Sequence, residues 1–196
     1  MEDHIKKNLT RKVLFIVLGV VVLAEVIWVG SMLIKPTPTI PPRAPQLAEI
    51  EPEKETVISL TTTASNLKVG ENIDVAIDLS SSKKSNASDL IINFDPKKLT
   101  VQNPSSPVVK GSIYGSYPIN KIDIKLGKIT VSGISEGVAV MADGLFGVVS
   151  FKAKAAGLTT ISVEFIPGST TDTNVIESET GEDILEKVQN LELNIQ

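Results

Sequence analysis

The sequence contains no cysteine and only one histidine, His4. Without disulfide staples, any exported domain of this chain must be held together by its packed core. Beyond His4 the chain offers neither an imidazole nor a thiol. Ser-His, Cys-His and zinc mechanisms are therefore excluded for the rest of the chain.

A concentration of positive charge is also lacking. The chain carries 19 Lys and Arg against 23 Asp and Glu, a net charge of -4, with the two signs dispersed along it. Nucleic-acid binding domains usually show a basic stripe, so we expect no nucleic-acid partner. The carboxylates show no spacing that singles out a hydrolytic pair, so we expect no enzymatic activity.

Aromatic residues are scarce, with one Trp and two Tyr. Sugar-binding modules usually lay exposed Trp or Tyr rings against the sugar. Trp28 lies in a long apolar run, which leaves Tyr114 and Tyr117 in a Gly-Ser-rich loop as candidates. The other rings fall in strand patterns typical of a core: Phe94, Phe146, Phe151 and Phe165. Carbohydrate binding therefore remains the alternative to protein recognition.

Residues 13–34 form a 22-residue apolar run that contains a single charge, Glu25. This is long enough to cross a bilayer as a helix. The cost of Glu25 is outweighed by fifteen Val, Leu, Ile and Phe residues, and Trp28 suits the membrane interface. The run therefore predicts a transmembrane helix in contact with membrane lipid, with Glu25 as a carboxyl that the span tolerates or that bonds to a partner helix.

Basic residues precede this run: Lys6, Lys7, Arg11 and Lys12. Only Lys35 directly follows it, so the positive-inside rule predicts a cytoplasmic N-terminus, residues 1–12, and an extracellular C-terminal part. The rival interpretation is a cleaved signal peptide. Because no A-x-A-like site ends the apolar run, we favour a retained signal-anchor in the cell membrane, crossed once.

Residues 35–56 carry six prolines in 22 positions. Such composition favours extended polyproline II backbone, and the glutamates near the end of this segment add like charge. The segment is predicted to be a Pro-rich linker that acts as a spacer.

From residue 57 to residue 196, short runs rich in β-branched residues alternate with turn residues, the pattern of an all-β sandwich. The expected strands are Val57–Thr63, Asn72–Leu79, Ser88–Phe94, Leu99–Val101, Ile122–Ile124, Lys128–Gly133, Leu145–Ala153, Thr159–Phe165, Asn174–Ile176 and Leu191–Ile195. Residues 135–143 are expected to form a loop or short helix. A helical turn is expected at 183–188, with its apolar side chains facing the sandwich.

Several motifs occur in an order that resembles a cohesin domain, over about residues 57–196. They are Leu67–Gly70, Leu90–Leu99, Gly127–Val131, Asp143–Phe146, Phe151–Lys152 and Gly157–Val163. The Phe94-Asp95-Pro96 element with Leu99 is the most specific of them. The resemblance implies a jelly-roll β-sandwich, a fold shared with carbohydrate-binding modules. It also implies binding of a dockerin, a small calcium-loaded helical module, through one flat sheet face.

Cohesins that bind dockerins commonly show an Asn and an Asp two apart before the Asp-Pro turn. This sequence has Ala87 and Asp89 there, so only the second matches. Strand alternation places Ile91 and Asn93 on the same face as Asp89. Thr130 and Ser132 alternate with apolar residues and are grouped with them. The candidate partner-binding residues are Asp89, Ile91, Asn93, Thr130 and Ser132.

Calcium is the only metal that the sequence suggests. Residues 171–174 and 177–183 supply hard oxygen ligands, but they form no D-x-D-x-D-G loop with a closing Glu. A solvated acidic loop is the favoured interpretation. We therefore expect no cofactor and no metal site.

Overall fold

The computed structural model describes Trp28 and residues 54–196 of the chain. Trp28 is helical, and its side chain is 64% exposed. Among these described residues, no helix has the length and apolar character needed to cross a membrane. Glu25, the remainder of the expected span 13–34, residues 1–12 and the linker up to residue 53 lie outside the described residues.

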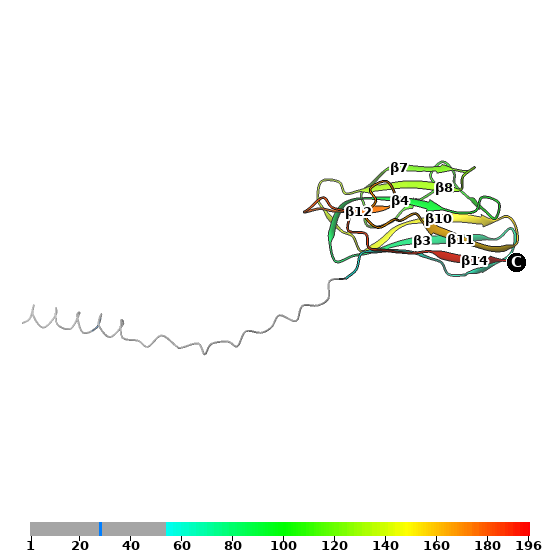
Figure 1. Ribbon diagram of the computed structural model, residues 1–196, viewed down its shortest axis with the longest axis horizontal. Coiled ribbons are helices and arrows are strands. Elements are labelled where there is room, and N and C mark those ends of the chain that lie inside the picture. Colours follow the sequence, from blue (N-terminus) through cyan, green and yellow to red (C-terminus); the bar gives the residue numbers. More distant parts are fainter. Residues whose placement is uncertain (1–27, 29–53) are drawn as a thin grey trace, which may run out of the picture. The chain divides into compact units, whose positions relative to one another are not determined.

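The described domain is a sandwich of two β-sheets (Figure 1). The six-stranded sheet has the order β13-β1-β3-β10-β5, and β6 also pairs with β10. Its strands are β1 (Val57–Thr61), β3 (Asn72–Ser80), β5 (Leu99–Val101), β6 (Val109–Lys110), β10 (Gly144–Ala153) and β13 (Lys187–Gln189). The all-β sandwich expected from the sequence is confirmed.

The eight-stranded sheet has the order β2-β14-β11-β4-β8-β7, and both β9 and β12 pair with β4. Its strands are β2 (Asn66–Leu67), β4 (Lys84–Asn93), β7 (Ser116–Asp123), β8 (Lys128–Ile134), β9 (Val140–Met141), β11 (Gly157–Val163), β12 (Asn174–Glu177) and β14 (Leu191–Ile195). β4 is thus the strand around which this sheet is organised.

The core lies between the sheets and follows the period-2 alternation of the strands. In β3 the buried and less buried positions alternate along the whole strand, and in β4 they alternate from Ser88 to the end, with Leu90 and Ile92 inside. Phe94 packs edge-on against Phe151 across the sandwich, with ring centroids 5.2 Å apart. This packing fixes which face of each strand remains for solvent or a partner.

One expectation about irregular segments is wrong. Residues 183–188 form no helical turn: Asp183 makes an isolated bridge to Ile176, and the chain then enters β13, which runs parallel to β1. Leu185 is nevertheless buried, as the apolar spacing indicated. Residues 135–143 form a loop, as expected, apart from the short strand β9, which pairs with the start of β4.

The two tyrosines are not available as sugar platforms. Tyr114 is only 2% exposed, and its ring packs edge-on against Phe146 at 5.8 Å. Tyr117 is half-buried against the same ring, and its hydroxyl donates to the Phe146 carbonyl. Tyr117 belongs to the strand β7, which begins at Ser116, earlier than the sequence pattern indicated, and Tyr114 lies just before it.

Candidate functional site

The outward face of β4 carries three of the predicted partner-binding side chains. Leu90 and Ile92 are 0% and 1% exposed and face the core, so Asp89, Ile91 and Asn93 lie on the opposite face. Asp89 is exposed, whereas Ile91 and Asn93 are half-buried. The alternation read from the sequence therefore places these three side chains together.

The strand β8 brings the other two predicted residues alongside. Its antiparallel register with β4 pairs Asp89 with Ser132 and Ile91 with Thr130. The Ser132 hydroxyl donates a hydrogen bond to Oδ1 of Asp89. Ser132 is only 6% exposed, so it supports Asp89 more than it offers a surface of its own. All five predicted residues therefore share one face of β4 and β8, which are neighbouring strands in Figure 1.

A charged cluster at one end of this face was missed by the sequence interpretation. Asn93 pairs with Lys128 across the strands, and both contact Glu164, which follows β11. Nδ2 of Asn93 donates to Oε2 of Glu164 at 3.1 Å, and Nζ of Lys128 lies 3.0 Å from the same oxygen. These two hydrogen bonds lower the pKa of the Glu164 carboxyl below its ordinary value.

Ile91 is held in place by a segment beyond the sheet. Its backbone N–H donates to the Thr173 hydroxyl at 3.0 Å, and its carbonyl accepts from the backbone N–H of Glu164. Thr173 in turn donates its N–H to the Glu164 carbonyl. Thr173 and Glu164 therefore fill the gap that β11 and β12 leave along β4. Both backbone polar groups of Ile91 have hydrogen-bond partners there.

The other end of the face is apolar. Ala87 pairs with Ile134 on one side and with Ile176 on the other. Ile134 is 37% exposed, and Ile119 of β7, which pairs with Ser132, is 42% exposed. Two exposed branched side chains, on β7 and β8, beside the half-buried Ile176 suit a protein-contact surface. The face therefore runs from a charged end, through Asp89, to an apolar end.

The residues considered for calcium do not converge. Oδ1 of Asp183 accepts from two backbone N–H groups, and Glu179 and Glu182 are exposed. Asp172 and Asn174 are buried, each with one side-chain oxygen that has no hydrogen-bond partner. Across residues 54–196, no three His, Cys, Asp or Glu side chains are grouped as a metal would require.

Comparison with known proteins agrees with this architecture. The cohesin domain family model matches residues 57–188. The chain therefore belongs to the cohesin domain family. No curated protein matches it.

Solved structures show the same fold. A type II cohesin domain from the cellulosome of Acetivibrio cellulolyticus has 19% identity and a TM-score of 0.61, covering 71% of this chain and 95% of that chain. The seventh ScaB type I cohesin from Pseudobacteroides cellulosolvens has 20% identity and a TM-score of 0.57, covering 72% and 92%. The cohesin of a type II cohesin-X-dockerin complex from Acetivibrio cellulolyticus has 19% identity and a TM-score of 0.54, covering 72% and 100%.

Proposed function

We propose that this cohesin domain binds a dockerin-type protein partner, without catalysis, through the outward face of β4 and β8. The observation that carries the proposal is the register that places Asp89, Ile91 and Asn93 beside Ser132, Thr130 and Lys128. A face with one hydrogen-bonded carboxylate, a charged cluster and an apolar end suits a folded protein surface better than a small ligand. One of the structural neighbours is itself a cohesin in complex with a dockerin.

No exposed ring supports the sugar-binding alternative in the described domain. The rings of Tyr114 and Tyr117 pack edge-on against Phe146 and cannot stack on a sugar. Protein recognition is thus the function that the chemistry of this face favours.

The test is a binding titration of the protein against calcium-loaded dockerin modules, with Asp89→Lys as the test variant. The chain offers a matched control in Asp74, an exposed aspartate of β3 on the other sheet. Asp74 also pairs across strands with a serine, Ser150, which donates to it as Ser132 donates to Asp89. Asp74→Lys therefore makes the same charge change in the same local setting, away from the face.

We expect Asp89→Lys to weaken binding by at least about tenfold, because it replaces a hydrogen-bond acceptor near the centre of the face with a longer, positively charged side chain. Asp74→Lys should leave the affinity within about twofold, and both variants should remain folded by circular dichroism. Equal loss in both variants would count against the face. Absence of binding to every dockerin would count against the partner class.

We further propose that residues 13–34 anchor the protein in the cell membrane, with residues 1–12 in the cytoplasm and the cohesin domain outside on its Pro-rich linker. The support is the length of the apolar run and the basic residues before it. Such an anchor would make the domain a surface scaffold for its partner.

Membrane fractionation and protease treatment of intact cells test this arrangement. The chain should stay with the membrane after an alkaline wash, and external protease should remove the domain. A soluble, shortened chain in the medium would instead indicate a cleaved signal peptide, and protection of the domain would reverse the topology.

A further inference from the structure

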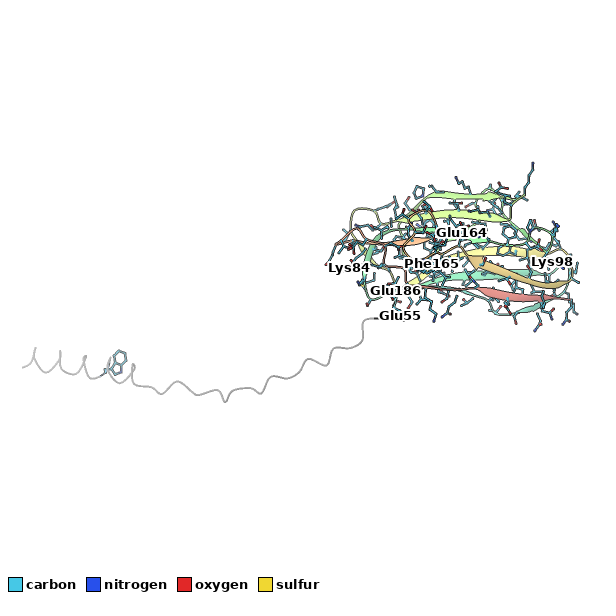
Figure 2. All side chains as sticks on the ribbon, viewed as in Figure 1. Glu55, Lys84, Lys98, Glu164, Phe165 and Glu186 are labelled. Atoms are coloured by element: carbon cyan, nitrogen blue, oxygen red, sulfur yellow. The ribbon has the colours of Figure 1, made fainter. Side chains whose placement is uncertain are left out.

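The end of the sandwich away from Glu55 is built from four turns that are joined by hydrogen bonds. The turn before β8 meets the turn after β4, because the Phe94 N–H donates to the Gly127 carbonyl at 2.8 Å. The loop after β10 meets the same turn, since the Lys154 N–H donates to the Lys98 carbonyl. The turn before β3 is joined to the loop after β10, because the Gly70 N–H donates to the Ala153 carbonyl. Figure 2 shows Lys98 at this end and Lys84, Glu55 and Glu186 at the other.

Lysines gather at this end, which we call the distal end and define by residues 68–71, 95–98, 123–128 and 152–158. They are Lys68, Lys97, Lys98, Lys125, Lys128, Lys152 and Lys154. Lys128 pairs with Glu164, and the ammonium groups of Lys98 and Lys154 donate to backbone carbonyls. Within residues 54–196, the other four lysines are exposed and form no ion pair with a carboxylate.

The carboxylates of the distal end are engaged by its own turns. Glu71 accepts from the backbone N–H of Lys68, and Asp95 accepts from that of Lys97. Asp123 accepts from two backbone N–H groups of the next turn. Acidic side chains gather instead at the other end, on Glu177, Glu179, Glu182, Asp183 and Glu186. The domain is therefore electrically polarised, although the whole chain is acidic.

Large apolar side chains stand among these lysines. Leu126 is 70% exposed at the tip of the turn between β7 and β8, and Leu158 is 79% exposed at the start of β11. Ile124 is 54% exposed on the same turn as Leu126, and Val69 is 50% exposed on the turn before β3. Isolated exposed apolar residues are ordinary, but four of them share one end of the sandwich with four exposed lysines, a combination that suits a surface with both charged and apolar parts.

We propose that the distal end binds the surface of an anionic phospholipid bilayer. The lysines would lie against the headgroup phosphates, while Leu126, Leu158 and Ile124 enter the boundary with the acyl chains. Charge complementarity and apolar burial act together on such a surface, and each contributes separately to binding. A soluble polyanion would use the lysines but leave the leucines in water. The distal end adjoins the charged end of the β4–β8 face at Lys128, but the lysines and leucines altered below lie outside the five residues proposed to bind the dockerin.

The test uses residues 54–196 of the chain. They lie within the compact unit Ile50–Gln196, and 95% of an isolated crystallised cohesin domain superposes on this chain. The fragment is sedimented with vesicles of phosphatidylcholine alone or of phosphatidylcholine with phosphatidylglycerol. Two double variants alter the distal end: Lys97→Glu with Lys125→Glu, and Leu126→Ser with Leu158→Ser. The matched control is Lys84→Glu with Lys187→Glu, which makes the same charge change at exposed lysines outside the distal end.

We expect binding to the anionic vesicles only, weakened at least about tenfold by the distal lysine pair and severalfold by the leucine pair, and unchanged by the control pair. Added salt should release the fragment from the vesicles. Equal binding to both vesicle types, or equal loss in the control, would overturn the proposal. Binding to a soluble polyanion with no effect of the leucine pair, or self-association without vesicles, would also overturn it in favour of that partner.

Discussion

At the scale of single residues, Ala87 makes one end of the β4–β8 face apolar. A cohesin that follows the family's common pattern has an asparagine at this position. Here Ala87 lies between Ile134 and Ile176 in cross-strand register, so a polar amide is replaced by a continuous apolar row. A partner bound as proposed would gain free energy at this end from burial of apolar surface rather than from a hydrogen bond. The proposed partner should therefore present an apolar side chain there.

Tyr117 gives a prediction about pH at the same scale. Burial raises the pKa of its hydroxyl from 10.0 to about 12, because the charged form would lose its hydration. Between these values the unfolded chain has released the proton and the folded chain keeps it, so the free energy of unfolding must fall as pH rises. Urea unfolding at a series of pH values from about 9 to about 12 measures this slope.

Tyr117→Phe should make that slope shallower without removing it, because burial also raises the pKa of the Tyr114 hydroxyl. The same decline in wild type and variant would mean that Tyr117 does not titrate in this range. The phenylalanine keeps the ring contact with Phe146, so the variant should remain folded.

At the scale of elements, the turn between β7 and β8 depends on Gly127. Its φ is +66°, and a Cβ placed there would lie 2.1 Å from the Phe94 carbonyl oxygen. Gly137, in the segment before β9, also has a positive φ of +90°, but nothing lies within 4 Å of its Cβ position. The positive φ would therefore strain any other residue placed at either glycine, but only at Gly127 would the added Cβ also clash with a neighbouring atom.

We expect Gly127→Ala to lower the free energy of unfolding by several kcal/mol, and Gly137→Ala by only about 1 kcal/mol. Chemical denaturation of both variants measures the difference. If the two losses are equal, backbone conformation alone matters and the close approach to Phe94 is relaxed at little cost.

Elements with uninterrupted alternation were predicted well from the sequence, and irregular ones were not. β5 and β14 have the bounds that were expected, because each alternates apolar and polar residues between turns. β7 was predicted as three residues. A register shift between Ser116 and Ile119 breaks its alternation, so the pattern does not reveal its length. β13 was taken for part of a helical turn, since apolar residues spaced for a helix also fit an extended edge strand.

The partner face shows the same limit. Alternation alone groups Asp89, Ile91 and Asn93, but the register between two strands cannot be deduced from the sequence of either strand alone. Glu164 lies 71 residues from Asn93 in the chain and 36 from Lys128. No local pattern connects them, although Lys128 has the parity of Thr130 and was within reach of the same reasoning.

At the scale of the whole molecule, folding creates a charge distribution that the linear sequence conceals. The lysines of the distal end come from four turns separated by tens of residues, and each turn looks like an ordinary solvated loop by itself. The sequence therefore shows dispersed charge, whereas the fold shows one basic and one acidic end. The β4–β8 face lies between these ends and meets the basic one at Lys128.

The whole domain includes a C-terminal strand, β14, whose contribution to folding can be tested. The family match ends at residue 188, but β14 follows it and lies between β2 and β11 in the larger sheet. Leu193 and Ile195 are 1% and 2% exposed, so β14 fills the core. We expect residues 54–196 to unfold in one cooperative transition that reductant does not change, because the chain has no cysteine.

A fragment ending at Val188 should fail to fold, because it loses two buried side chains and leaves an unpaired edge on β11. Leu193→Ala, which keeps the strand pairing, should instead fold with a free energy of unfolding lower by about 2–5 kcal/mol. Thermal unfolding followed by circular dichroism separates these outcomes. A cooperative transition in the fragment would mean that the first twelve strands and most of β13 close the core alone, and that β14 serves only to cover the edge of the sheet.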